Sequence, residues 1–106
     1  MAMVSTATAN PALHQMCMNK YNMLVLRLNR CNDARKVINA IEFYYDNCDL
    51  ELKEQAMLHI NDHTFQAQKS LLKTLIKEVI NRDMINYVQT GDETFPLCMQ
   101  VNELLK

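Results

Sequence analysis

TFQAQKSLLKTLIKEVINR, residues 64–82, is the stretch against which the rest of this sequence must pack. Its apolar side chains recur at helical spacing and fall within one broad face of a helix: Phe65, Leu71, Leu72, Leu75, Ile76, Val79 and Ile80. Burial of one such side chain stabilises a fold by roughly 1.5–3 kcal/mol. A single short helix cannot hide all of them, so we expect the other segments of the chain to surround this one.

The composition predicts an all-α protein. One Gly (Gly91) and two Pro (Pro11 and Pro96) in 106 residues are too few for the turns of a β-rich fold, and alternating strand patterns do not extend over a useful length. We therefore expect a compact bundle of five or six short helices. It would form a single helical domain over residues 10–106, after a disordered N-terminal tail at residues 1–9.

Cap and turn residues divide the chain into its expected helices. The sequence predicts helices over 11–30, 34–47, 50–60, 64–82, 84–89 and about 92–106. The expected N-caps are Asn10, Asn32 or Asp33, Asp49, Asp62 or Thr64, Asp83, and Asp92 or Thr94. Asp83 would fall on the apolar face if the helix over 64–82 continued. We therefore expect it to cap a new short helix, with a kink as the alternative.

The charge balance and the cysteines limit the expected partners and cellular location of the protein. Eleven basic and twelve acidic residues argue against attraction of the whole surface to nucleic acid or to an anionic membrane, and leave local patches open. The longest apolar run, 23–26, is far too short to span a bilayer. The first nine residues do not resemble a secretion signal, and the four cysteines are widely spaced (Cys17, Cys31, Cys48 and Cys98). We expect reduced cysteines in a cytoplasmic or nuclear protein that is not secreted. Its eleven Asn and eight Met suit an AT-rich coding genome, such as some viruses have.

Histidine and cysteine pairs are the candidate metal or catalytic groups. His59 and His63 are four residues apart, and His14 lies three residues before Cys17, which are spacings that metal ligands use. A complete site would require distant helices to meet, and no CxxC or HExxH motif is present. One glycine excludes glycine-rich phosphate loops. We therefore expect no enzymatic activity, no cofactor, no metal and no small-molecule substrate.

Two groups of basic residues suggest one possible ligand. Lys69, Lys73 and Lys77 form a row along one helix face, and a second group surrounds the turn after the first helix: Lys20, Arg27, Arg30, Arg35 and Lys36. Such rows can follow a phosphate backbone, so sequence-independent binding of duplex nucleic acid, including double-stranded RNA, is an alternative function. The other interpretation is that the lysines belong to an ordinary solvated face.

The helix over 11–30 is apolar on two sides. With Leu13 at zero, Cys17, Tyr21, Leu24 and Leu28 fall between about 20° and 80°, and Met16, Met23 and Leu26 between about 220° and 300°. One neighbouring helix cannot cover both arcs. The helix is therefore either central in the bundle or covered by a partner.

We predict a protein interface along the second arc, formed by Met16, Met23 and Leu26, with Asn19 and Arg30 as its polar rim. When the same strip meets its symmetry mate, apolar burial favours a homodimer. The expected function is that of a non-enzymatic protein–protein interaction module that associates with itself and acts as a structural or regulatory subunit.

Overall fold

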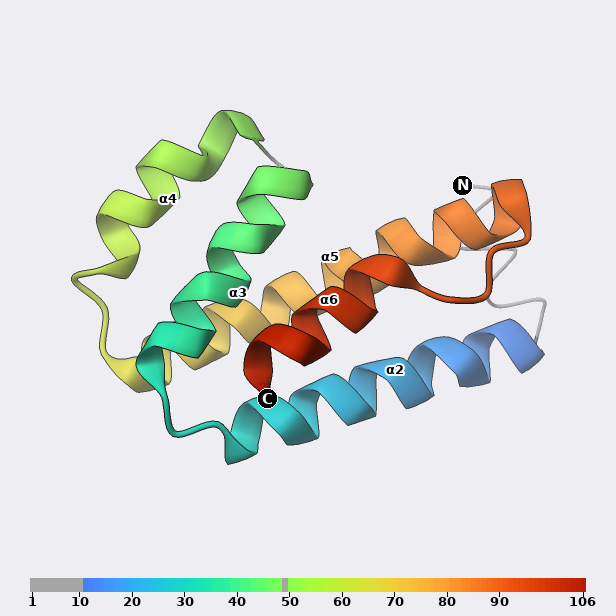
Figure 1. Cartoon of the computed structure of the whole chain (residues 1–106), viewed down its shortest axis with the longest axis horizontal. Helices are drawn as coiled ribbons and strands as arrows, with labels where there is room; N and C mark the ends of the chain where they lie inside the picture. Colours follow the sequence, from blue (N-terminus) through green and yellow to red (C-terminus); the bar gives the residue numbers. More distant parts are fainter. Residues whose placement is uncertain (1–10, 49) are drawn as a thin grey trace.

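The computed structural model describes residues 11–48 and 50–106 (Figure 1). Its elements are α2 (Pro11–Arg30), α3 (Ala34–Asn47), the 3-10 helix η1 (Leu50–Leu52), α4 (Lys53–Ile60), α5 (Phe65–Thr90) and α6 (Pro96–Leu105). Five α-helices and no strand occur within these residues, which confirms the predicted all-α bundle. The predicted tail at residues 1–9 and the predicted caps Asn10 and Asp49 lie outside the described residues.

Three helices follow the long dimension of the molecule. Figure 1 shows α2, α5 and α6 running side by side, with α3 crossing them near one end and α4 outermost beyond α3. The helices α2, α3, α5 and α6 pack against one another, whereas α4 packs mainly against α3 and η1. The centre of the bundle therefore lies among four helices, and α4 is attached at its edge.

The predicted apolar face of α5 is in the core. Leu72, Leu75, Ile76, Val79 and Ile80 are buried, and Phe65 and Leu71 are partly buried. The other core side chains come from every α-helix and from the connecting loops: Leu13, Leu24, Leu28, Cys31, Val37, Ala40, Ile41, Tyr44, Cys48, Ile60, Met84, Phe95, Cys98, Val101 and Leu105. The helix chosen from the sequence thus packs against three others, α2, α3 and α6.

The second apolar arc of α2 is partly covered within the chain. Because α2 contacts both α5 and α6, two neighbours cover more of its circumference than one could. Met16 and Met23 are partly buried against the core, and Leu26 alone of the three is 50% exposed.

The expected break at Asp83 does not occur. α5 continues through this residue to Thr90, and Asp83 is buried on the apolar face. Its Oδ1 accepts a hydrogen bond from the backbone N–H of Leu97 at 3.2 Å, and its Oδ2 accepts one from the N–H of Cys98 at 2.8 Å. The carboxylate therefore caps α6 from another helix, where negative charge also suits the helix dipole.

At the remaining helix ends, some predicted caps are confirmed and others are corrected. Asp33 accepts from the N–H of Arg35 and caps α3, and Thr64 accepts from the N–H of Ala67 and caps α5. Gly91 ends α5 in the left-handed conformation (φ 77°), where a missing Cβ removes the strain. Neither Asp92 nor Thr94 caps α6, since the helix begins after Phe95, whose φ is 49°.

Candidate binding groove

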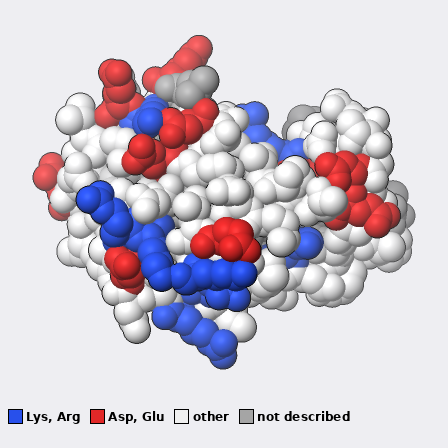
Figure 2. All heavy atoms as spheres, viewed as in Figure 1, with Lys and Arg blue, Asp and Glu red and all other residues white. Residues whose placement is uncertain are grey.

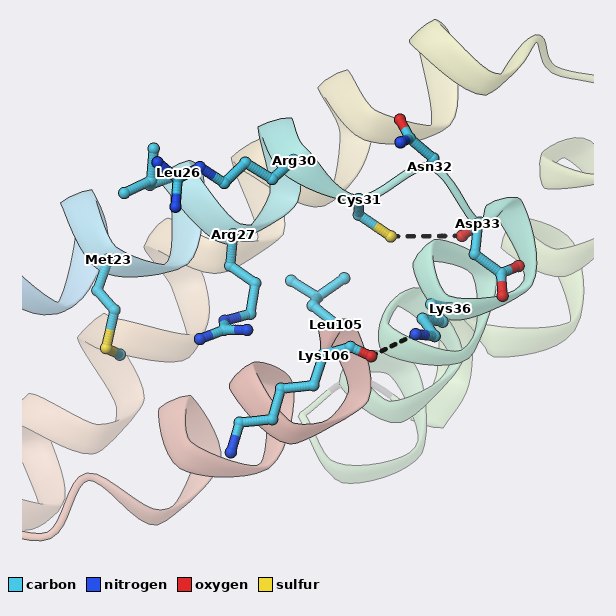
Figure 3. A pocket seen from close by; sticks show the side chains of 10 residues that line it. All are labelled: Met23, Leu26, Arg27, Arg30, Cys31, Asn32, Asp33, Lys36, Leu105 and Lys106. Carbon is cyan, nitrogen blue, oxygen red and sulfur yellow. Dashed lines mark hydrogen bonds between the residues drawn. The ribbon is translucent and has the colours of Figure 1, made fainter.

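A groove of about 500 Å³ lies where the end of α2, the α2–α3 loop, the start of α3 and the end of α6 meet (Figure 3). It is lined by Met23, Leu26, Arg27, Arg30, Cys31, Asn32, Asp33, Lys36, Leu105 and Lys106. Residues from both ends of the chain thus form one concavity. We refer to these ten residues as the basic groove.

Arg27 is the polar side chain with an unmet hydrogen bond in the basic groove. Figure 3 shows its guanidinium between α2 and α6, on the side of α2 where Leu105 and Lys106 lie. The residue is partly buried, and its Nε is buried without a hydrogen-bond partner among the described residues. A buried donor left without an acceptor is unfavourable by about 1–3 kcal/mol. The side chain of Arg27 lines the groove, so an anionic group that enters can accept hydrogen bonds from the accessible part of its guanidinium.

Other cations surround Arg27. Lys36 donates through its Nζ to the backbone oxygen of Lys106. The Nζ of Lys106 lies 2.9 Å from Glu103 in an exposed ion pair, and Arg30 is exposed at the end of α2. The helix dipole favours Arg27 and Arg30, because both lie in the last turn of α2, where carbonyl oxygens are exposed. Four cationic side chains thus face one carboxylate, Asp33, in the lining.

The groove also has an apolar component. Leu26 is 50% exposed, Met23 is partly buried and Leu105 is buried. Cys31 is buried, and its Sγ donates to the backbone oxygen of Asp33 at 3.5 Å. The groove can therefore hold a segment that carries both an apolar side chain and a negative charge.

The structure brings together part of the basic group predicted around the first turn. Figure 2 shows a continuous blue band over the ends of α2 and α6 and the start of α3. Arg27, Arg30 and Lys36 line the groove, and Arg35 is exposed near it on the first turn of α3. Lys20 is not part of this group, because its Nζ lies over the ring of Phe95, 5.9 Å from the centroid.

The lysine row of α5 lies along the boundary with α2. Lys69 donates to the backbone oxygen of Asn29 at 3.3 Å, and its Nζ lies 4.8 Å from the centroid of Phe65. The Nζ of Lys77 lies 5.8 Å from the ring centroid of Tyr21, and Lys73 is exposed. Two of the three ammonium groups thus contact neighbouring side chains or backbone instead of forming an unobstructed row.

The predicted protein interface falls partly in the groove. Met23, Leu26 and Arg30 line it, whereas Met16 and Asn19 are not among its lining residues. Asn19 is exposed and accepts a hydrogen bond from Gln15 at 2.9 Å. Sequence reasoning missed Leu105 and Lys106, because no local pattern reveals that the end of α6 lies beside residues about 70 positions earlier, as the bond from Lys36 shows.

The cysteines and histidines do not gather into a site. Among the described residues, no group of three or more His, Cys, Asp or Glu side chains is placed to hold a metal ion. Burial raises the pKa of the Cys17 thiol. Burial, together with the Asp83 carboxylate, also raises that of Cys98 well above its ordinary value. Both groups are therefore protonated at neutral pH and are weak nucleophiles.

Within the described part of the chain, none of the helices combines the length and the apolar character needed to cross a membrane. Comparison of the chain with protein-family models, with curated proteins and with solved structures gives no significant match. The groove and the surfaces around it are therefore the features that can indicate a function.

Proposed function

We propose that this protein is a non-enzymatic protein–protein interaction module that associates with further copies of itself through the basic groove and acts as a structural or regulatory subunit. One observation carries the proposal: an exposed leucine lies in the same concavity as a guanidinium whose buried Nε has no acceptor among the described residues (Figure 3). In a cytoplasmic or nuclear setting, as proposed from the sequence, the four cysteines remain free thiols, as they are in the structure.

Both features become more favourable when a protein partner covers them. Full burial of a leucine side chain stabilises by roughly 1.5–3 kcal/mol, of which Leu26 has about half still to gain because it is 50% exposed. A carboxylate that reaches Arg27 would form a charge-assisted hydrogen bond, and these are stronger than neutral ones. A partner that carries an apolar side chain beside an acidic one satisfies both requirements.

Light scattering and sedimentation over a range of protein concentrations test the proposal. We expect the mass of the wild-type protein to rise with concentration. A variant carrying Leu26→Glu and Arg30→Glu should stay monomeric with unchanged helical circular dichroism, because both side chains are exposed. Val88→Gln is the matched control, since it removes a 43% exposed apolar side chain at the far end of α5. A wild-type protein that stays monomeric at its highest soluble concentration would refute the proposal.

The second candidate function is sequence-independent binding of duplex nucleic acid. The observation that favours it is the continuous band of cations in Figure 2, over the elements where Arg27, Arg30, Lys36 and Lys106 line the groove. Neutralising phosphates with such side chains releases counterions, so the binding would weaken steeply with added salt. No aromatic side chains are interleaved with these cations, which favours contact with the backbone of a duplex over stacking on single-stranded bases.

A titration of double-stranded RNA and of double-stranded DNA at low and high salt tests this candidate. We expect Arg30→Glu together with Arg35→Glu to weaken duplex binding more than Lys69→Glu, Lys73→Glu and Lys77→Glu do, because both arginines are exposed whereas the two outer lysines of that row already have contacts. Absence of wild-type binding at low salt, where screening is weakest, would exclude this function.

A further inference from the structure

A second exposed apolar surface lies on α4, at the edge of the bundle. Leu58 is 74% exposed, the most of any large hydrophobic side chain among the described residues, and Leu52 is 48% exposed. Met57 is partly buried against the core, and it lines a surface hollow together with Glu54, Leu58 and Asn61. Leu58 lies on α4, which packs mainly on α3 and η1, and Leu52 is the last residue of η1. Neither leucine is covered by the described residues, so another molecule could cover both.

Acidic side chains border this apolar surface. Glu51 and Glu54 are exposed, and Figure 2 shows acidic side chains gathered over α4 and the end of α3. The Nζ of Lys53 forms an ion pair with Asp46 and lies 3.7 Å from the Oε1 of Glu42. The hydrogen bond with Asp46 raises the pKa of Lys53. The cation of α4 is thus already engaged, whereas Glu51 and Glu54 form no ion pair within the described residues. We call Glu51, Leu52, Glu54 and Leu58 the acidic edge.

We propose that the acidic edge of one copy occupies the basic groove of the next copy. The inference rests on the self-association proposed above and names the two surfaces that meet. Each surface supplies what the other lacks: the groove offers Arg27, Arg30 and Lys36 beside Leu26, and the edge offers exposed carboxylates beside exposed leucines. A carboxylate of the edge can accept hydrogen bonds from the guanidinium of Arg27, whose buried Nε has no acceptor among the described residues.

The contact is head-to-tail, because the groove and the edge are different parts of one molecule. The groove lies where α2, α3 and α6 meet, and the edge lies on η1 and α4 beyond α3 (Figures 1 and 2). After one contact forms, the pair therefore keeps one free groove on one copy and one free edge on the other. Such heterologous contacts build rings when the rotation closes and open chains when it does not, whereas a self-complementary α2 strip stops at a dimer.

The experiment uses two variants, each lacking one surface. The groove variant carries Leu26→Glu and Arg30→Glu, and the edge variant carries Glu54→Gln and Leu58→Gln. All four side chains are exposed, so both variants should retain the helical circular dichroism of the wild-type protein. We expect each variant alone to associate at least tenfold more weakly than the wild-type protein, and Val88→Gln to associate like it.

Mixing the two variants is the decisive measurement. The edge variant retains a working groove and the groove variant retains a working edge, so an equimolar mixture should form a 1:1 complex that does not grow further. The two altered surfaces combine acidic with neutral polar side chains and should not attract each other. The mixed complex should also weaken as salt rises, since the contact is between opposite charges.

The other outcomes separate the two proposals. If the edge variant associates as strongly as the wild-type protein while the groove variant does not, the groove receives some other part of the chain and the acidic edge is not its occupant. If both variants fail alone and their mixture stays monomeric, the contact is not head-to-tail and the inference fails. If the wild-type protein never associates, the proposed function and the inference fail together.

Discussion

Asp83 is a buried charged residue and Arg27 a partly buried one. They differ in whether their buried polar atoms have hydrogen-bond partners. Both oxygens of Asp83 accept backbone hydrogen bonds from the start of α6, at 3.2 and 2.8 Å, and the residue is 2% exposed. The buried Nε of Arg27 has no partner among the described residues, and its side chain lines an open groove. One charge is satisfied within the fold, and the other is not.

This difference indicates which charge serves the fold and which is available to a ligand. Removing a buried charge whose hydrogen bonds are complete leaves its partners unsatisfied, which is strongly destabilising. Removing a charge whose donor is unsatisfied leaves no such deficit. Asp83 should therefore determine stability, and Arg27 should determine binding.

Asp83→Ala tests the first half of the comparison and should have the largest effect on folding. The change removes two hydrogen bonds to a charged acceptor, worth about 1.5–3 kcal/mol each, and leaves the N–H groups of Leu97 and Cys98 buried. We expect the free energy of unfolding to fall by about 3–5 kcal/mol in urea titrations. Asp83→Asn keeps one acceptor and nearly the same shape, so it should be less destabilising. Equal losses for the two variants would contradict the capping role.

Leu75→Ala measures the loss of stability when one buried apolar side chain is truncated, for comparison with the losses at the charged residues. Leu75 is 6% exposed on the core face of α5, so its truncation should lower the free energy of unfolding by about 2–5 kcal/mol through lost burial and a residual cavity. Lys73→Ala is the control on the exposed face of the same helix and should change it by less than about 0.5 kcal/mol. Equal urea midpoints for the two variants would overturn the assignment of faces.

Arg27→Met tests the second half of the comparison. Met keeps the length of the apolar stem and removes the unsatisfied Nε, so we expect the free energy of unfolding to change by no more than about 1 kcal/mol. Self-association, measured by sedimentation, should weaken at least tenfold. A loss of stability as large as that of Asp83→Ala would show that the guanidinium serves the fold and is not reserved for a ligand.

Asp92 should produce the smallest effect, visible in the pH dependence. Hydrogen bonds from the hydroxyl and then the N–H of Thr94 lower its pKa, so its contribution is fully present above the ordinary value near 4 and is lost as pH falls through the lowered value. We expect the difference in stability between the wild-type protein and Asp92→Asn to shrink below about pH 4. A difference that stays constant between pH 6 and 3 would contradict this assignment.

Part of the candidate site was predictable from the sequence. Met23, Leu26, Arg27, Arg30 and Lys36 were singled out because an apolar second arc and a cluster of cations are local patterns on neighbouring helical turns. Leu105 and Lys106 were missed as lining residues, since their place in the groove depends on how α6 returns across the bundle. The exposure of Leu58 was also missed, although an apolar residue off the inward stripe of a short helix was a signal that could have been followed.

The sequence by itself determined the all-α class, the bounds of α2 and α3, and the core face of α5, because helix periodicity and caps such as Asp33 and Thr64 act over three or four residues. The tertiary structure decided that Asp83 caps α6, that Met16 and Met23 are partly buried, and that the groove exists. Each of these depends on a partner far away in the chain, as the bonds from Asp83 to Leu97 and Cys98 show. Local patterns predict which face of a helix is apolar, but the packing of whole helices decides which hydrogen bonds are satisfied and which remain open.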